Sequence, residues 1–339
     1  MSKVIAESAS KEVPEEMEYG THTLVMTTNN LCNLECGHCY LQYDNHDSPF
    51  ISNELIDAAV NSSVKHLALV GKEAFVNGKS AEITKRITES ALSRGKTVSI
   101  ISNGINLPNY LTRDFPKPTF VDISFDGGPE SYKITRHNKT GRDFYPMAFT
   151  GAKRVLDLGI PLSVLHTIHS RNIGHLDDLM TPVLELDGLQ RAMFSPYITT
   201  QNDGVNDVNG LTIEKTIEEL SQTTRFMDYK NSHLFLDTFT SPRIEEKIDR
   251  LSHKYGMNEK IIIIPKEVLA QIMRLNYDGK VLTPQESVHT SLYNRLGYNF
   301  NPKTEKLDEV LERIRRRNVG KMFSISNSED SQLNQTGGI

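Results

Sequence analysis

The chain has 339 residues, of which 37% are hydrophobic and 24% charged, and its formal net charge is −5. These values are typical of a folded globular protein and argue against a nucleic-acid partner, which would need a strongly basic surface. No apolar stretch approaches the ~20 residues of a membrane-spanning helix. The first 20 residues carry five glutamates and no apolar signal-peptide core. We therefore expect a cytoplasmic protein with no membrane segment.

In chain order, residues 1–20 are polar and are expected to form a mobile arm. The hydrophobic pattern then predicts strands over 21–28, 64–70, 97–102, 120–125, 162–169 and 190–195, separated by helices over 52–63, 81–94, 144–158 and 175–186. Such alternation makes βα units and a parallel sheet. About six units are too few to close an eight-stranded barrel. The predicted fold class is α/β, a partial (β/α)6 TIM-like barrel with a parallel sheet over residues 21–200.

Beyond residue 200 the alternation weakens. Helices are predicted over 211–227, 241–255 and 306–318, and strands over 233–238, 261–264 and 268–275, the last followed by a turn at 277–280. We expect residues 201–320 to form a smaller α+β C-terminal extension that covers the substrate. Residues 321–339 are expected to be a disordered tail.

All three cysteines of the chain lie in one octapeptide directly after the first predicted strand, as Cys32, Cys36 and Cys39. Three thiolates on one side of a short loop suit an iron–sulfur cluster that keeps one iron without a protein ligand. A structural zinc ion would need a fourth ligand, and His38 is poorly placed to supply it. The alternative is that the three cysteines bind no metal and are inert, buried side chains.

Polar or glycine-rich residues follow the next three strands as well. These are the turn Gly71-Lys72-Glu73-Ala74, the tripeptide Ser102-Asn103-Gly104, and Asp126-Gly127-Gly128. In a parallel sheet the ligand lies beyond the carboxyl ends of the strands. We therefore expect four strand ends to share one rim with the cysteines.

Together, the cysteine loop and these strand ends resemble the radical S-adenosylmethionine (radical SAM) enzymes. The resemblance implies that the three cysteines bind one 4Fe–4S cluster and that S-adenosylmethionine (SAM) chelates its fourth iron. It implies that Glu73 accepts hydrogen bonds from the SAM ammonium, although Lys72 and Ala74 depart from the family's Gly-Gly-Glu-Pro turn. The same resemblance assigns further SAM contacts to Gly71, Ser102, Asn103, Ser124 and Asp126, with Tyr40 and Thr167 as candidates beside the adenine.

Residues 277–284 resemble the hairpin of the SPASM or twitch extension that many of these enzymes carry, in which a cysteine follows an Asp-Gly turn. Here Pro284 occupies that position, and no cysteine follows residue 39. An ordinary hairpin can also contain Asp-Gly. We interpret the extension as a degenerate, cysteine-free relative without an auxiliary cluster.

The resemblance implies an enzyme that takes one electron from flavodoxin or ferredoxin, cleaves SAM to methionine and a 5′-deoxyadenosyl radical, and abstracts hydrogen from a substrate carbon. With every cysteine committed to one cluster, the chain has no thiol hydrogen donor and no second cluster to accept an electron. We therefore expect redox-neutral or decarboxylating chemistry. Tyr197 is a candidate hydrogen donor, although a packed core tyrosine is the plainer interpretation.

The substrate is expected to be a small polar metabolite, such as a sugar, nucleoside or amino acid, in a specialised biosynthetic pathway. The alternative is a maturase of a ribosomally made peptide whose leader-binding domain is a separate protein. A non-catalytic iron–sulfur protein and a zinc module are alternatives of another class. Side chains that could line a substrate pocket are His166, His169, Arg171, Arg191 and Asp237.

Overall fold

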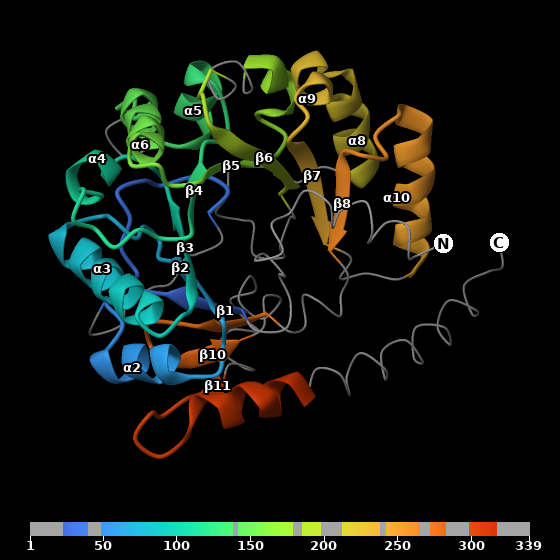
Figure 1. The fold of residues 1–339 in the computed structure, drawn as a ribbon. Helices are drawn as coiled ribbons and strands as arrows, with labels where there is room; N and C mark the ends of the chain where they lie inside the picture. Colours follow the sequence, from blue (N-terminus) through green and yellow to red (C-terminus); the bar gives the residue numbers. More distant parts are fainter. Residues whose placement is uncertain are drawn as a thin grey trace.

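The computed structural model describes residues 23–39, 49–137, 142–178, 185–197, 212–237, 242–264, 272–282 and 298–316. Their strands form one sheet in the order β11-β10-β9-β1-β2-β3-β4-β5-β6-β7-β8. Figure 1 shows this sheet curved, with helices on its outer side. The two ends of the strand order, β11 and β8, are not paired to each other, so within the described residues the barrel is open. The predicted α/β fold class with a parallel sheet is confirmed.

Each strand from β1 to β8 pairs in parallel with the next. The first six lie where the sequence predicts them, and β7 and β8 extend the parallel run past residue 200. The strands are β1 Thr23–Thr27, β2 His66–Val70, β3 Thr97–Ser102, β4 Phe120–Ser124, β5 Leu162–Ile168, β6 Leu189–Pro196, β7 Ser232–Asp237 and β8 Ile261–Ile264. The domain boundaries at residues 200 and 320 stay a prediction, but the sheet crosses the first of them.

Helices connect these strands and cover one face of the sheet (Figure 1). They are α2 Asn53–Asn61, α3 Gly78–Leu92, α4 Leu107–Tyr110, α5 Pro129–Thr135, α6 Tyr145–Asp157, the 3-10 helix η2 Ile173–His175, α8 Ile213–Gln222, α9 Thr224–Asp228, α10 Pro242–Tyr255, and a helix over 307–316. Ser52 caps α2, because its side chain accepts from the backbone N–H of Leu55 at 3.3 Å.

Three helical predictions differ from the structure. The helix predicted over 211–227 is broken at Thr223, whose extended backbone (ψ 100°) ends α8 and precedes α9. The short helix α5 is not predicted from the sequence, because its seven residues carry too little apolar periodicity. At the start of the helix predicted over 175–186, η2 is followed by helical residues 176–178, but residues 185 and 186 at its predicted end form a turn and a bend.

A hairpin extends the sheet on the other side of β1. Strand β9 (Met273–Leu275) pairs in parallel with β1, β10 (Lys280–Leu282) pairs antiparallel with β9, and β11 (Tyr298–Asn299) pairs antiparallel with β10. The turn lies where the sequence predicts it, with Gly279 at φ 84°. Pro284, the position of the missing cysteine, is outside the described residues, and assignment to the SPASM branch stays a prediction.

The two faces of the sheet can be told apart from one close contact. A Cβ at Gly104 would lie 3.0 Å from the Ala148 carbonyl oxygen of α6 and 3.1 Å from Cγ2 of Ile123 on β4. Ile123 therefore faces the helices, and its neighbours Asp122 and Ser124 face the opposite way, into the barrel interior. No helix in the described part of the chain is long and apolar enough to cross a membrane.

Candidate functional site

The cysteine loop leaves β1 at the carboxyl end of the sheet. All three cysteines are free and only partly exposed, and the N–H of Cys39 donates to the carbonyl of Cys36 at 3.0 Å. Burial raises the pKa values of Cys32 and Cys36 to about 12, and the nearby Arg136 guanidinium opposes this at Cys36. Without a metal these two thiols therefore stay protonated at neutral pH.

The carboxylate of Glu73 organises the rim next to this loop. Its side chain is 1% exposed. Oε1 accepts from the Ser102 hydroxyl at 2.7 Å and from the Phe75 N–H at 2.9 Å, while Oε2 accepts from the Asn103 N–H at 2.7 Å. Burial raises the pKa of Glu73, and the three hydrogen bonds oppose that rise. The turn after β2 and the end of β3 are thus joined through one buried acid.

Asn29 joins the start of the cysteine loop to the same turn, a role that sequence analysis missed. Its Nδ2 donates to the Glu73 carbonyl at 3.0 Å, and its own carbonyl accepts from the Lys72 N–H at 3.2 Å. A Cβ at Gly71 would lie 2.8 Å from Asn29 Nδ2. Glycine at position 71 therefore lets the turn approach the loop.

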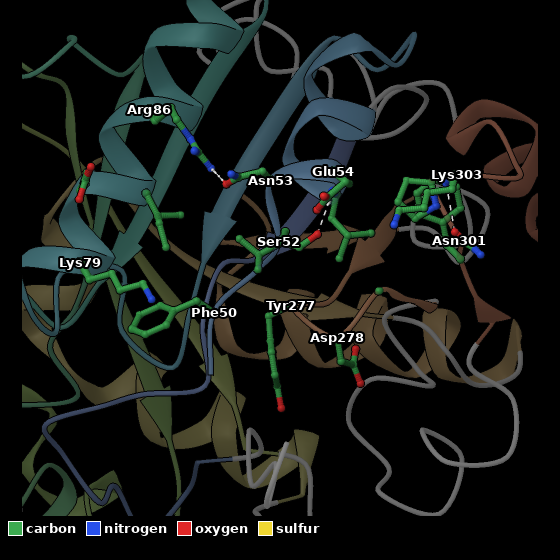
Figure 2. Close-up of a pocket in the computed structure, with 17 residues that line it drawn as sticks. Phe50, Ser52, Asn53, Glu54, Lys79, Arg86, Tyr277, Asp278, Asn301 and Lys303 are labelled. Carbon is green, nitrogen blue, oxygen red and sulfur yellow. Dashed lines mark hydrogen bonds between the residues drawn. The ribbon is translucent and has the colours of Figure 1, made fainter. Parts of the chain in front are cut away.

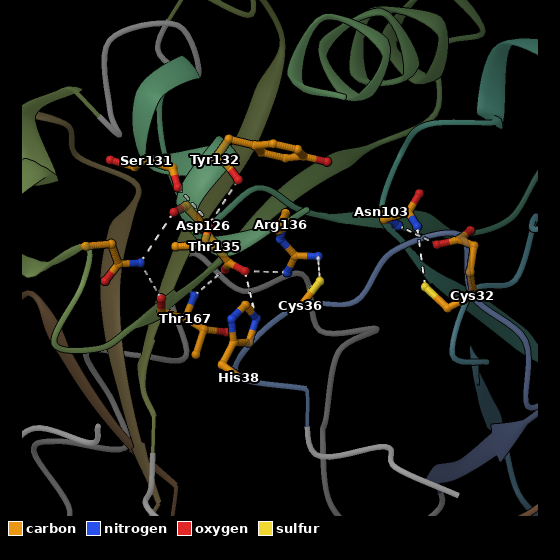
Figure 3. Close-up of polar contacts among 12 residues, drawn as sticks. Cys32, Cys36, His38, Asn103, Asp126, Ser131, Tyr132, Thr135, Arg136 and Thr167 are labelled. Carbon is orange, nitrogen blue, oxygen red and sulfur yellow. Dashed lines mark hydrogen bonds and ion pairs between the residues drawn. The ribbon is translucent and has the colours of Figure 1, made fainter. Parts of the chain in front are cut away.

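Asn103 connects the end of β3 to the first cysteine. Its Nδ2 donates to Asn33 Oδ1 at 2.8 Å and lies 3.9 Å from Cys32 Sγ (Figure 3). The Leu34 N–H also donates to Cys32 Sγ, at 3.4 Å. The Cys32 sulfur therefore faces hydrogen-bond donors, which favour the thiolate form that binds metal.

The end of β4 holds the other side of the loop through Asp126, which is fully buried. Its Oδ2 lies 2.5 Å from a guanidinium nitrogen of Arg136 and 2.9 Å from Nε2 of His38, and its Oδ1 accepts from the Thr167 N–H at 2.6 Å (Figure 3). Burial disfavours the charged carboxylate, but Arg136 and His38 outweigh it and hold the pKa of Asp126 far below its usual range. The second guanidinium nitrogen of Arg136 lies 3.9 Å from Cys36 Sγ.

This cluster of contacts explains an unusual backbone conformation. Asp126 has a φ of 51°, in the left-handed region that few residues other than glycine adopt. The buried Asn172 amide supports it, donating to the Asp126 carbonyl at 3.3 Å and to the Thr167 carbonyl at 2.7 Å. The ends of β4 and β5 are thereby fixed to each other and, through His38, to the cysteine loop.

Aromatic rings line the loop on its far side. The His38 ring stacks on His169 with 5.5 Å between centroids and meets Tyr197 edge-on at 6.5 Å. Burial lowers the pKa of His169 to about 4. Tyr197, the candidate hydrogen donor, is therefore near the cysteine loop but is 8% exposed and packed against it.

The sequence is similar to those of known proteins. The model of the radical SAM superfamily matches residues 26–181, which include the cysteine loop and the ends of β1 to β5. This chain is a member of the radical SAM superfamily. A curated relative, a probable GTP 3′,8-cyclase from Methanococcus aeolicus, is 24% identical over 216 residues, or 60% of this chain and 70% of the relative.

Solved structures of radical SAM proteins share the fold. Native anSMEcpe with bound AdoMet superimposes with a TM-score of 0.55 at 14% identity, covering 86% of this chain and 80% of the other. SuiB of Streptococcus suis bound to S-adenosylmethionine gives 0.54 at 11% identity, covering 90% and 69%. At these identities the likeness shows the fold alone.

Members of the superfamily use a 4Fe–4S cluster and SAM, and the residues of the loop fit such a cluster. Three free thiols occupy one loop, and two of them face a nitrogen donor, the Asn103 amide or the Arg136 guanidinium. With a cluster bound, these groups would stabilise the negative charge of the cysteine sulfurs. The chain is an enzyme of the radical SAM type, and the assignment of Cys32, Cys36 and Cys39 as the ligands of its cluster stays a prediction.

The remaining predicted site residues are placed as follows. Ser124 ends β4 on the interior face, and Thr167 lies on the same face of β5. Arg191 pairs in register with Ser163 on the interior face. His166 faces the helices instead, stacked on Phe194 at 4.6 Å. Tyr40 and the side chain of Asp237 lie outside the described residues.

A cavity of about 820 Å³ opens elsewhere, between the start of α2, α3, the turn after β9 and residues 300–303 (Figure 2). Its charged lining mixes both signs, and Arg86 already donates to Asn53 at 2.6 Å. Because no cysteine and no predicted SAM-binding residue lines this cavity, it is separate from the radical SAM site.

Proposed function

We propose that this radical SAM enzyme abstracts hydrogen from a carbon of a small polar metabolite, a sugar, nucleoside or amino acid, in redox-neutral or decarboxylating chemistry of a specialised biosynthetic pathway. The observation that carries the proposal is the joining of the cysteine loop to the rim through Asn103 and Arg136. When bound, the cluster and SAM supply the 5′-deoxyadenosyl radical. The 24% identical relative, named for a reaction of GTP, supports a nucleoside-like metabolite.

The roles proposed for the rim follow from its remaining hydrogen-bonding capacity. A carboxylate has about four acceptor positions, and Glu73 uses three of them within the protein. The position left on Oε2 is proposed to accept from the SAM ammonium. Asp126 also has three partners, so we propose that its main role is to hold the cysteine loop in place. Its contact with SAM stays a prediction, as do those of Gly71, Ser124, Thr167 and Tyr40.

A radical SAM enzyme needs a reductant, and we propose flavodoxin or ferredoxin. The test of the whole proposal is anaerobic reconstitution with iron and sulfide, followed by dithionite and SAM. We expect about four iron atoms per chain and formation of 5′-deoxyadenosine, with both lost in Cys36→Ala. An intact cluster that yields no 5′-deoxyadenosine would contradict the catalytic proposal and favour a non-catalytic iron–sulfur protein.

The second candidate is a peptide maturase. It is favoured by the fold likeness to SuiB, which has also been solved bound to its precursor peptide SuiA with a TM-score of 0.54. The two candidates separate in a binding experiment with the reconstituted enzyme and SAM. Tight binding of a precursor peptide together with no binding of nucleosides, sugars or amino acids would reject the metabolite proposal.

A further inference from the structure

The inner face of the barrel carries polar side chains that the SAM site does not use. Met26, Leu69, Ile100 and Val121 pair in register across β1 to β4, and Leu275 of β9 pairs with Met26. Val121 lies on the same face as Ile123, toward the helices. The residue after each of these therefore points into the interior.

Three members of that interior row are polar: Asn276, Thr27 and Asp122, which we call the interior polar row. Asn276 and Thr27 are completely buried and Asp122 is 4% exposed. Among the described residues, neither amide atom of Asn276, nor Thr27 Oγ1, nor Asp122 Oδ1 has a hydrogen-bond partner. Buried polar side-chain atoms are nearly always paired, so these atoms point to a ligand.

The fold itself does not need the Asn276 side chain. An asparagine at the first position of a turn usually accepts from the backbone two residues later. The Asn276 side chain makes no such bond, and the side-chain bond within the turn comes from Asp278, whose Oδ1 accepts from the Lys280 N–H at 3.1 Å. Asn276 contributes to the turn through its backbone: its carbonyl accepts from the Gly279 N–H at 2.9 Å, and its N–H donates to the Lys280 carbonyl at 2.9 Å. Its amide is left for another purpose.

The chemistry of the interior polar row indicates what would pair with it. The Asn276 amide offers one acceptor and two donors on a planar group, and the Thr27 hydroxyl offers one of each. The positive charge of Arg191 acts on Asp122, and Ser163 donates to it. Because the Asn276 amide and the Thr27 hydroxyl are uncharged, the ligand atoms that pair with them need not carry a charge.

We propose that the interior polar row binds an uncharged, amide-type edge of the substrate, a carboxamide or a nucleobase that pairs with Asn276 and Thr27. Thr27 is the last residue of β1, so this ligand lies directly below the cysteine loop. The inference rests on the proposed function, because it assigns the substrate class to that site. A sugar without an amide or base is thereby excluded.

Binding to the reconstituted enzyme with SAM, unreduced, tests the proposal by calorimetry. The probes are guanosine, an N-acetyl-asparagine methylamide, and ribose as the amide-free comparison. We expect guanosine or the amide to bind and ribose not to bind. The probe that binds more tightly then shows whether the recognised edge belongs to a nucleobase or to a carboxamide. Asn276→Leu and Thr27→Val should each weaken binding at least tenfold, about 1.4 kcal/mol. The matched control Thr23→Val, on the same face at the far end of β1, should leave binding unchanged.

Thermal unfolding without the probes separates binding from a structural role. Asn276→Leu removes unpaired buried atoms, so we expect its Tm to equal or exceed that of the wild type by a few degrees. A lowered Tm, equal loss of SAM affinity, or failure of the wild type to bind either probe would overturn the proposal. Probe binding without any 5′-deoxyadenosine formation would count against the proposed function and leave this site standing.

Discussion

Asp122→Asn tests whether the barrel interior holds a carboxyl group that folding keeps protonated. Burial raises the pKa of Asp122 to about 7, although the Arg191 charge and a Ser163 hydrogen bond oppose the rise. The folded protein therefore binds this proton more tightly than the unfolded chain, whose carboxyl has an ordinary pKa of 3.8. Its contribution to stability is greatest at acid pH and falls as pH rises toward 7. About 3 pKa units at 1.36 kcal/mol each amount to about 4 kcal/mol, of which about 2.5 kcal/mol lies between pH 5 and pH 8.

The pH dependence of the wild type alone would hide this effect. His66 is partly buried and His166 and His169 are buried, and burial lowers the pKa of each to about 4. The unfolded chain binds those protons more tightly, so the histidines make stability rise with pH between about 4 and 6.5. Only the difference between Asp122→Asn and the wild type isolates the acid, because both proteins keep all three histidines.

The assay is chemical denaturation of the reconstituted enzyme from pH 5 to pH 8, followed by circular dichroism because the chain has no tryptophan. Measured relative to the wild type at the same pH, the free energy of unfolding of Asp122→Asn should rise by about 2.5 kcal/mol from pH 5 to pH 8. The exposed Asp114, with its pKa lowered to about 2 by hydrogen bonds from Thr112 and Lys85, provides the control. Asp114→Asn should show a constant difference. A constant difference for Asp122→Asn as well would refute the reasoning.

Three further substitutions test the packing of the site. Arg136→Gln leaves the buried Asp126 carboxylate with one ion-pair partner fewer, and we expect a loss of about 3 kcal/mol in the free energy of unfolding; an unchanged value would contradict the ion pair. Glu73→Gln turns an NH2 group toward at least one backbone N–H in either amide orientation, so we expect a loss of about 1–3 kcal/mol together with weaker SAM binding in calorimetry. Gly151→Ala places a Cβ 2.0 Å from the Gly104 carbonyl oxygen and should cost about 3 kcal/mol, whereas Gly174→Ala meets nothing within 4 Å and should change stability by less than about 0.5 kcal/mol.

The strands of the sheet could be predicted because buried parallel strands read as short apolar runs between helices. Ile261–Ile264 is such a run, and the sequence predicts it as a strand. Its place beside β7 could not be predicted, because a strand of four apolar residues carries no information about its neighbour. The pairing of β9 with β1 was equally hidden, since the hairpin pattern specifies only the antiparallel partner of β9.

The candidate site divides in the same way. Glu73, Ser102 and Asn103 could be found because each lies at or just after the end of a predicted strand. Arg136 could not, because it follows α5, a helix with little apolar periodicity whose only local signal is the proline at its first turn. Arg136 forms its ion pair with Asp126 because of where α5 lies relative to the end of β4. The spacing of residues in the sequence does not indicate this placement.

The pairing of β9 with β1 also bears on the order in which the protein is made. Leu24 lies beside Met273 in the finished sheet, and contacts between such distant parts of a chain form late because loop closure is costly. During synthesis, β1 and the cysteine loop leave the ribosome long before their outer neighbour exists. The cysteine loop therefore follows a strand whose outer edge stays unpaired until the last quarter of the chain has been synthesised.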